Sequence, residues 1–402
     1  MITAEAWSNK KYAVYGLARS GLATVRALVA SGAEVTAWDR SEEARAKAEG
    51  ATLLDLDTAD LSRFDSLVVS PGVPLNTHPI AARARQAGVE IIGDIELFAR
   101  ARSELPTHKV VGITGTNGKS TTTALVHHIL ATAGVPTTMG GNIGLPILAQ
   151  DPLPEGGVYV LELSSYQIDL TQSLDCDVAV ILNITPDHLD RYESFDAYAE
   201  SKLRLFGMST GITERTDRWV VNNADYPALK GIHNGQNVGA ASFICGALNL
   251  TYDDIVEPAL RTFPGLPHRM ERVRELNGTL FVNDSKATNA EAAAPALAAY
   301  PRIRWIVGGQ AKTEELGDTA NHLDHVVRAY TIGEAGPLFA RLLRERGVDV
   351  IESETLENAV KSCARDSQPG ETVLLSPACA SFDQFRDFEA RGEAFRALVG
   401  AL

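Results

Sequence analysis

Short β-rich runs alternate with longer helical patterns along most of this 402-residue chain. Near the N-terminus, Tyr12–Tyr15 and Glu34–Trp38 have the composition of strands, and Ser20–Ala30 between them has that of a helix. Such alternation is typical of stacked βαβ units, which build parallel sheets. We therefore expect an α/β protein. Further strands and helices are expected at Leu67–Val69, Glu90–Ile92, Lys109–Ile113, Lys119–Ala133, Val158–Leu161, Val178–Ile184, Ser194–Leu205, Asn237–Leu248, Thr279–Val282, Asn289–Tyr300, Arg304–Val307, Val326–Thr331 and Thr372–Leu375.

Two stretches of polar or helix-breaking residues divide this alternation into three parts. One is Ala101–His108, just before an expected strand, and the other is Phe263–Pro267, which holds two prolines and a glycine. The chain is also two to four times as long as a usual domain of about 100–200 residues. We expect three α/β domains, at residues 1–105, 106–265 and 266–402.

The charge and the cysteines of the chain exclude several classes of protein. With 51 Asp and Glu against 37 Lys and Arg, the net charge is −14, so the surface repels nucleic acid and anionic membranes in bulk. No apolar run approaches the roughly 18–20 residues of a membrane span, and residues 1–11 have no apolar signal core. The four cysteines form no C-x-x-C pair, which favours buried thiols in a reducing compartment. We expect a cytoplasmic protein without nucleic-acid or membrane partners.

A glycine-rich loop stands between an expected strand and an expected helix in the middle part, with the sequence Gly115-Thr116-Asn117-Gly118-Lys119-Ser120-Thr121. The glycines let backbone N–H groups turn toward a phosphate, the helix N-terminus adds positive potential, and Lys119 neutralises phosphate charge. The Ser120 hydroxyl can bind magnesium. Ile113 stands where the strict G-x-x-x-x-G-K pattern has glycine, so the loop is a variant. We predict that it binds a nucleoside triphosphate and is not an ordinary glycine turn.

A second glycine loop, Gly16–Gly21, follows the first expected strand. Asp39 stands at the end of the next strand, where a ribose partner would. Ala18 occupies the middle glycine position of the dinucleotide pattern G-x-G-x-x-G. The loop indicates either a nucleotide site or a glycine needed for helix packing, and it does not decide between them.

Polar residues follow the strands of the middle part, where ligand groups gather in parallel sheets. Glu162 follows one strand, and Asn183, Asp187 and His188 follow another. A carboxylate and an imidazole near a triphosphate suggest coordination of magnesium, which neutralises transferring phosphoryl charge. A lone histidine is more often structural, but the phosphate loop makes His188 a candidate ligand.

The last part of the chain repeats this arrangement. The runs Asn283–Asn289, Gly308–Lys312 and Ser376–Ser381 each follow an expected strand. Their lysines and hydroxyls suit a small dicarboxylate or a transferring phosphate. Helix capping would give Asp284 and Ser381 an equally ordinary role.

Several motifs, in order along the chain, carry a resemblance to a known family. Residues 112–121 resemble the ATP loop of the Mur ligases, which build the peptide stem of the bacterial cell wall, although folylpolyglutamate and cyanophycin synthetases share that loop. The motifs that favour the Mur ligases are Gly140–Gly144, Asn183–Arg191, Leu266–Arg269, Asn283–Asn289 and Ser376–Phe385. The last two resemble the branch of the family that adds D-glutamate. The resemblance extends from about residue 11 to the C-terminus.

The resemblance implies both a fold and a reaction. The fold is α/β, with a Rossmann-like N-terminal domain, a central P-loop ATPase-like domain with a mainly parallel sheet, and a C-terminal Rossmann-like domain. In the reaction, ATP phosphorylates the carboxylate of UDP-N-acetylmuramoyl-L-alanine, and the amine of D-glutamate then displaces the phosphate to form an amide. These two small molecules are the implied partners, and ATP with two Mg²⁺ ions are the implied cofactors. We expect a monomer.

The same resemblance implies roles for individual residues. The implied catalytic residues are Lys119, Glu162, His188, Lys202 and Lys286. The implied magnesium ligands are Ser120, Glu162, His188 and a carbamylated Lys202. The implied ATP-binding residues are Gly115, Thr116, Asn117, Gly118, Lys119, Ser120, Thr121, Asn234, Asn237, Arg269 and Asp284. The implied contacts of the UDP-linked substrate are Leu17, Ala18, Arg19, Asp39, Arg40, Ser70, Pro71, Gly72, Asn142 and His188. The implied contacts of D-glutamate are Thr288, Lys312, Ser381, Phe382 and Phe388.

Two of these implications have a simple chemical basis. An ammonium group at Lys202 would repel Mg²⁺, whereas a lysine carbamate presents anionic oxygens; without the resemblance, Lys202 reads as a plain surface lysine. The missing second glycine of Gly16–Gly21 agrees with UDP rather than NAD.

Two other functions stay open. A related Mur or folylpolyglutamate-type ligase would use another amino-acid acceptor, and a non-catalytic regulator would only bind nucleotide. The Ser376–Phe385 run argues against the first. The joint presence of Lys119, Glu162, His188, Lys202 and Lys286 argues against the second, because a binding module needs no groups for acyl transfer.

Overall fold

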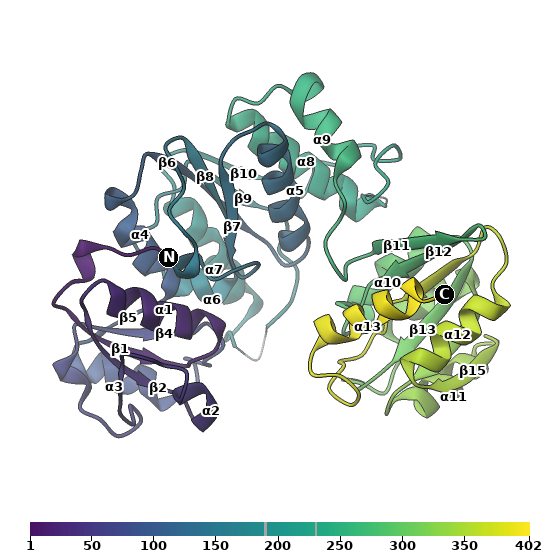
Figure 1. The fold of residues 1–402 in the computed structure, drawn as a ribbon, viewed down its shortest axis with the longest axis horizontal. Helices are drawn as coiled ribbons and strands as arrows, with labels where there is room; N and C mark the ends of the chain where they lie inside the picture. Colours follow the sequence, from purple (N-terminus) through teal and green to yellow (C-terminus); the bar gives the residue numbers. More distant parts are fainter. Residues whose placement is uncertain (189–190, 230) are drawn as a thin grey trace. The chain divides into compact units, whose positions relative to one another are not determined.

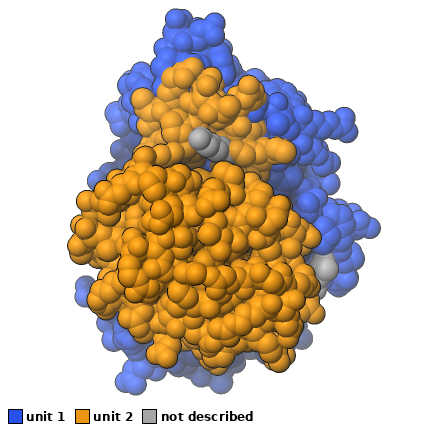
Figure 2. Space-filling model, turned by 90° about the vertical axis from the view of Figure 1, so that its right-hand side faces the viewer, with its two compact units in different colours: residues 1–221, 236–260 blue, residues 222–235, 261–402 orange. Residues whose placement is uncertain are grey.

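The computed structural model describes residues 1–188, 191–229 and 231–402 as strands alternating with helices (Figure 1). The chain forms two compact units, one of residues 1–221 with 236–260 and the other of residues 222–235 with 261–402 (Figure 2). The first unit contains two five-stranded sheets, and the second contains one six-stranded sheet. The α/β fold class expected from the alternation is confirmed.

The N-terminal sheet consists of parallel strands in the order β3-β2-β1-β4-β5. Strand β4 is buried at every position, as apolar strands in the middle of parallel sheets are. The strands are β1 (Lys11–Tyr15), β2 (Glu34–Trp38), β3 (Thr52–Leu53), β4 (Ser66–Val69) and β5 (Glu90–Ile92). The helices are α1 (Arg19–Ala30), α2 (Glu42–Arg45), α3 (Pro79–Ala87) and α4 (Asp94–Ala101).

The middle sheet is also parallel, in the order β10-β9-β6-β8-β7. Its central strand, β6, leads into the phosphate loop, so the loop lies at the middle of the carboxyl edge of this sheet. The strands are β6 (His108–Thr114), β7 (Thr137–Gly141), β8 (Gly157–Glu162), β9 (Val178–Ile181) and β10 (Ile212–Arg215). The helices that follow β6 in the sequence are α5 (Lys119–Thr132), α6 (Ser165–Asp169), α7 (Phe195–Gly207), α8 (Ile232–Ala247) and α9 (Glu257–Thr262).

Two expected elements differ at one end by three residues or more from those observed. Strand β9 ends at Ile181 and not at Ile184, because Asn183 turns its backbone and side chain toward the phosphate loop instead of the ladder. Helix α8 begins at Ile232 and not at Asn237. The sequence pattern did not indicate this first turn, because Gly235 disfavours a helix. In the structure, the Gly235 N–H nevertheless donates to the carbonyl of Gly231 at 3.0 Å.

The C-terminal sheet is mixed, in the order β11-β12-β16-β13-β14-β15. Only the β11–β12 pair among these strands is antiparallel, and the other pairs are parallel as expected of a Rossmann-like domain. The loop of this hairpin is Asn277-Gly278, with φ of 52° and 76°, the residue pair that a two-residue hairpin favours. The strands are β11 (Glu271–Leu276), β12 (Thr279–Asn283), β13 (Ile303–Gly308), β14 (Val326–Ile332), β15 (Val350–Glu354) and β16 (Thr372–Leu375). The helices are α10 (Ala290–Ala299), α11 (Gly336–Glu345), α12 (Leu356–Asp366) and α13 (Phe388–Gly400).

One continuous hydrophobic core joins the two sheets of the first unit. It includes Trp7 and Phe98 from the N-terminal part and Tyr159 from β8, and the Phe98 ring meets the Tyr159 ring edge-on at 5.0 Å. All four cysteines are buried and free, as expected. Among the residues that the structure describes, no helix is long and apolar enough to cross a membrane.

Glu96 on α4 joins the N-terminal part of the first unit to its middle part by hydrogen bonds. Its Oε2 accepts from the N–H groups of Gln172 and Ser173 at 2.7 and 2.8 Å, and its Oε1 accepts from Arg100 Nε at 2.8 Å. The side chain is only 1 % exposed. Its loss would leave two backbone donors without an acceptor.

We therefore predict that Glu96→Ala lowers the free energy of unfolding by about 1–3 kcal/mol, the usual cost of unsatisfied buried donors. Urea denaturation followed by circular dichroism measures this change. Glu43→Ala is the control, because it removes a carboxylate from an exposed pair with Lys47. Equal denaturation curves for the two variants would contradict the prediction.

Candidate functional site

The phosphate loop has the conformation that its glycines predict. It leaves β6 at Thr114 and enters α5 at Lys119, with Gly115 and Gly118 at φ of 156° and 84°. A Cβ atom on Gly118 would stand 2.3 Å from Oδ1 of Asn237, so any other residue would have to displace that side chain as well as adopt a left-handed backbone. Lys119 Nζ donates to the carbonyls of Gly115 and Thr116, each at 2.8 Å.

Asn183, at the end of β9, fixes the loop from the side. Its backbone carbonyl accepts from Thr116 N at 2.9 Å, and its Oδ1 accepts from Asn117 N at 2.8 Å. Its Nδ2 in turn donates to the carbonyl of Asn117 at 3.0 Å. The loop is therefore held in shape by the neighbouring strand end.

Lys202 lies beside the loop and is buried, not on the surface. It projects from α7, is 2 % exposed, and donates from Nζ to the carbonyl of Gly115 at 2.9 Å. Burial and, next, the charge of Lys119 lower its pKa to about 7. A large fraction of this amine is therefore neutral near neutral pH.

Glu162, the last residue of β8, is a buried carboxylate 1 % exposed. Its Oε1 accepts a hydrogen bond from Asn142 Nδ2 at 2.8 Å, so the structure brings these two predicted residues together. Its Oε2 has no hydrogen-bond partner among the residues that the structure describes. Because buried polar atoms are nearly always satisfied, this oxygen is suited to a bound cation.

His188 follows β9 and has a left-handed backbone, with φ of 54°. Its Nε2 lies 3.5 Å from Asp187 Oδ2, and its ring packs against Tyr166 at 5.1 Å and Tyr198 at 6.1 Å between centroids. Tyr198 connects the predicted residues: its hydroxyl is 3.1 Å from Thr116 Oγ1, and its ring lies 4.7 Å from Lys202 Nζ.

Tyr166 and Tyr198 were not among the site residues predicted from the sequence. The only available signal was the spacing of four between Tyr198 and Lys202, which places both on one face of α7.

The predicted magnesium ligands fit a magnesium site better than a site for a softer metal. No group of three or more His, Cys, Asp or Glu side chains able to hold a metal occurs within residues 1–188, 191–229 and 231–402. A magnesium site does not need such a group of side chains, because Mg²⁺ is usually bound by one or two carboxylates together with phosphate oxygens and water. Glu162 Oε2 offers such a carboxylate, and Ser120 is buried in the first turn of α5.

The predicted UDP-substrate residues of the N-terminal part form a connected loop system. Asp39 accepts from Leu17 N at 2.7 Å, and Ser70 Oγ donates to the carbonyl of Gly16 at 2.7 Å. Arg19 donates to the carbonyl of Gly144 at 2.9 Å, which reaches the loop that carries Asn142. Ala18 precedes α1 as its N-cap residue, Arg40 Nη2 lies 3.3 Å from His78 Nε2, and Pro71 and Gly72 follow Ser70 in the same loop.

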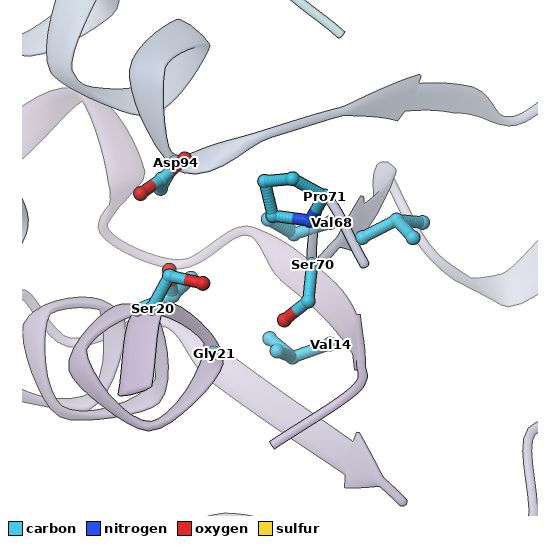
Figure 3. Close-up of a pocket in the computed structure, with 9 residues that line it drawn as sticks. Val14, Ser20, Gly21, Val68, Ser70, Pro71 and Asp94 are labelled. Carbon is cyan, nitrogen blue, oxygen red and sulfur yellow. The ribbon is translucent and has the colours of Figure 1, made fainter. Parts of the chain in front are cut away.

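Asp94 is a buried carboxyl group that was not among the predicted site residues. It starts α4 and faces a small pocket that also has Ser20, Gly21, Ser70 and Pro71 in its wall (Figure 3). Burial raises the pKa of Asp94 to about 6. No pattern of the sequence signals this, because Asp at a helix start is ordinary.

The second unit holds its predicted residues around the end of β12. Asp284 is buried, with Oδ2 accepting from Ser376 Oγ at 2.8 Å and Oδ1 from Met270 N at 3.1 Å. Burial raises its pKa to about 7, although the Arg269 charge acts in the opposite direction. Lys286 Nζ lies 5.1 Å from the centre of the Phe388 ring, which brings these two predicted residues together.

The other predicted residues of the second unit are less connected. Ser381 is buried, and its carbonyl accepts from Gln384 N and Phe385 N. Phe382 is 69 % exposed. The side chains of Lys312, Phe382 and Thr288 make no hydrogen bond or ring contact with the other predicted residues among those described. Asn234 of the second unit and Asn237 of the first are both buried residues of α8.

Arg391 on α13 was also missed, although it supports these loops. It is 1 % exposed and donates to the carbonyls of Ser285, Cys379 and Ala380. These residues flank Lys286 and Ser381, so the buried guanidinium holds both loops. A single arginine in a helix gives no sequence signal of such a role.

The loop, the helix that begins at Lys119 and the buried acidic residue on the neighbouring strand define a nucleotide-binding protein of the P-loop class. Comparison with known proteins identifies the family. The chain matches the MurD-like N-terminal domain of Mur ligases over residues 10–93, the Mur ligase middle domain over 113–256, and the Mur ligase glutamate ligase domain over 268–379.

Close relatives match this chain over its full length. A protein of Novosphingobium aromaticivorans named UDP-N-acetylmuramoylalanine–D-glutamate ligase is 57% identical over 100% of this chain and 97% of its own. A protein of Zymomonas mobilis with the same name is 51% identical over 100% of both chains. The chain belongs to the Mur ligase family.

Solved structures share the fold at low sequence identity. The UDP-N-acetylmuramate-alanine ligase MurC of Thermotoga maritima is similar with a TM-score of 0.61 and 18% identity, over 98% of this chain and 99% of that one. The MurF ligase of Thermotoga maritima in complex with ADP gives a TM-score of 0.58 and 16% identity, over 99% and 97%. These similarities show that the overall fold is shared.

The close approach of Gly118 to Asn237 gives a test of the phosphate loop. We predict that Gly118→Ala weakens nucleotide binding at least tenfold in calorimetry, because the new Cβ displaces the Asn237 side chain or the loop itself. Gly134→Ala is the matched control, at the other end of α5: Gly134 has φ of 75° but nothing within 4 Å of its Cβ position. That variant pays only the left-handed strain of about 1–2 kcal/mol. Equal nucleotide affinity of both variants would contradict the prediction.

Proposed function

We propose that this protein is an ATP-dependent ligase that joins D-glutamate to UDP-N-acetylmuramoyl-L-alanine in the synthesis of peptidoglycan precursors. The observation that carries the proposal is that Lys119 and Lys202 both bond the Gly115 carbonyl, with the buried carboxylate of Glu162 at the end of the neighbouring strand. The choice of substrates is supported by the name of the full-length relatives.

The proposed reaction has two steps. The γ-phosphoryl group of ATP is transferred to the carboxylate of the UDP-linked substrate, which gives an acyl phosphate and ADP. The amine of D-glutamate then attacks the acyl carbon, a proton leaves the nitrogen, and the tetrahedral intermediate expels inorganic phosphate to form the amide. Catalysis is by alignment and charge stabilisation, so the reaction needs no covalent protein nucleophile.

The residues of the phosphate loop have specific tasks in this reaction. Lys119 is proposed to bind the triphosphate, together with the loop residues Gly115, Thr116, Asn117, Gly118, Ser120 and Thr121. Two Mg²⁺ ions would stabilise the negative charge of the transferring phosphoryl group. Their proposed protein ligands are Ser120, Glu162, His188 and carbamylated Lys202.

Carbamylation of Lys202 is chemically favoured by its surroundings. The neutral amine attacks carbon dioxide, a C–N bond forms, and one proton is released, so the product carries a negative charge. With a pKa of about 7, Lys202 has this reactive neutral form available. The carbamate would replace a repelled ammonium with anionic oxygens beside Glu162.

The remaining predicted residues are proposed to bind the substrates. The UDP-linked substrate is assigned to Leu17, Ala18, Arg19, Asp39, Arg40, Ser70, Pro71, Gly72, Asn142 and His188. The adenosine part of ATP is assigned to Asn234, Asn237, Arg269 and Asp284. D-Glutamate is assigned to Thr288, Lys312, Ser381, Phe382 and Phe388, with Lys286 near the reacting amine.

The proposal extends to the state of the protein in the cell. We propose a cytoplasmic monomer that acts on small molecules and has no nucleic-acid or membrane partner. Its domains are assigned to residues 1–105 for the UDP-linked substrate, 106–265 for ATP and 266–402 for the amino acid.

The amino-acid acceptor is tested by phosphate release. With ATP, magnesium and UDP-N-acetylmuramoyl-L-alanine, we predict release with D-glutamate and little with L-glutamate, L-lysine or meso-diaminopimelate. Hydroxylamine should trap the activated acid when the amino acid is left out. Turnover with one of the other amino acids, and none with D-glutamate, would replace the proposed acceptor.

A second prediction concerns Lys202. Lys202→Ala is expected to lose about 10²-fold or more in kcat, a loss typical of removing a group that stabilises transition-state charge, and added formate or acetate should restore part of it. The activity of the parent should fall below about pH 7, because protonation of the amine removes the nucleophile for carbon dioxide. Lys361→Ala, at an exposed ion pair, is the control. Equal rates for Lys202→Ala and the parent would refute the role.

A further inference from the structure

Arg191 donates hydrogen bonds to three consecutive backbone carbonyls of another loop in the first unit. Its Nη2 lies 2.9 Å from the carbonyl oxygen of Val73 and 3.4 Å from that of Pro71, and its Nη1 lies 3.5 Å from that of Gly72. The bond to Val73 is the short one, and the other two are long and weaker. The guanidinium fork thus spans the turn that follows Ser70.

The other contacts of Arg191 lead to His188. Its backbone N–H donates to the carbonyl of His188 at 2.9 Å. Its guanidinium carbon lies 4.2 Å over the centre of the Tyr166 ring, and that ring packs against the imidazole of His188 at 5.1 Å. Arg191 therefore bonds the turn through its side chain, and it contacts His188 directly through its backbone N–H and indirectly through the Tyr166 ring.

The two segments come from different sheets. The Ser70–Val73 turn follows β4 of the N-terminal sheet, and His188 follows β9 of the middle sheet. The turn belongs to neither a helix nor a strand, and such connections are more mobile than the elements that they join. A contact that fixes it relative to His188 removes an ordering cost from substrate binding.

We propose that Arg191 is a positioning residue, which holds the Ser70–Val73 turn and His188 at a fixed separation and so preorganises the binding site of the UDP-linked substrate. The inference rests on the proposed function, because that substrate defines the site. Arginine suits the task better than lysine, since its rigid fork reaches several carbonyls while its flat face packs on Tyr166.

The test compares substrate affinities of the full chain by calorimetry. Arg191→Met keeps most of the apolar stem and removes the fork, and we expect it to bind UDP-N-acetylmuramoyl-L-alanine about tenfold more weakly while ATP affinity stays unchanged. Arg191→Lys should bind like Arg191→Met. In steady-state assays the loss should fall on KM for the UDP-linked substrate and not on kcat. Arg344→Met, which removes an arginine that bonds Glu352 and the Val350 carbonyl, is the matched control.

The outcomes separate this inference from the proposed function. If the parent does not bind the UDP-linked substrate, the proposed function fails. If the parent binds it and Arg191→Met binds it equally well, the positioning role is overturned. Parental affinity in Arg191→Lys would show that charge suffices, and an equal loss of ATP affinity in Arg191→Met would show general damage to the unit; either result also overturns the role.

Discussion

The carbonyl oxygen of Gly115 accepts hydrogen bonds from two lysines, Lys119 and Lys202, and the chemistry of the middle sheet depends on this pair. Burial makes it costly to charge Lys202, and repulsion from the Lys119 ammonium at the same oxygen adds to that cost. The lowered pKa of Lys202 is the consequence. Negative charge relieves the repulsion, whether it comes from a phosphate on the loop, from Glu162 or from a carbamate on Lys202 itself. The site is therefore prepared for anions.

The fold around Gly115 keeps its carbonyl in place. With φ of 156°, Gly115 has a conformation that glycine adopts most readily, and a Cβ there would lie 3.0 Å from Leu182 Cβ. Asn183 holds the next two residues of the loop through backbone and side chain. The end of β9 at Ile181 therefore matters for the site. If the strand continued, the Asn183 carbonyl would be paired with a neighbouring strand and could not bond Thr116 N.

The sequence predicted those parts of the fold that depend on local patterns. Apolar runs such as Val178–Ile181 mark central parallel strands, and the glycine loop marks the turn into α5. The Asn277-Gly278 pair is a sequence signal for the β11–β12 hairpin, but no hairpin was predicted there. The contacts of Arg191 with the Ser70–Val73 turn were not detectable, because they join residues more than a hundred positions apart. The burial of Lys202 likewise depends on the packing of α7 against β6. The residues next to Lys202 in the sequence do not indicate that packing.

Three basic side chains of this acidic protein donate hydrogen bonds to backbone carbonyls. Lys202 bonds Gly115, Arg191 bonds the Pro71–Val73 turn, and Arg391 bonds Ser285, Cys379 and Ala380. A carbonyl satisfies the hydrogen-bonding capacity of a cation without cancelling its charge, as a carboxylate would. Arg191 and Arg391 therefore keep their positive charge without an ion-pair partner among these contacts, within a chain of net charge −14. This reconciles the overall charge with the chemistry, since the proposed substrates are phosphates and carboxylates that only local sites of this kind can attract.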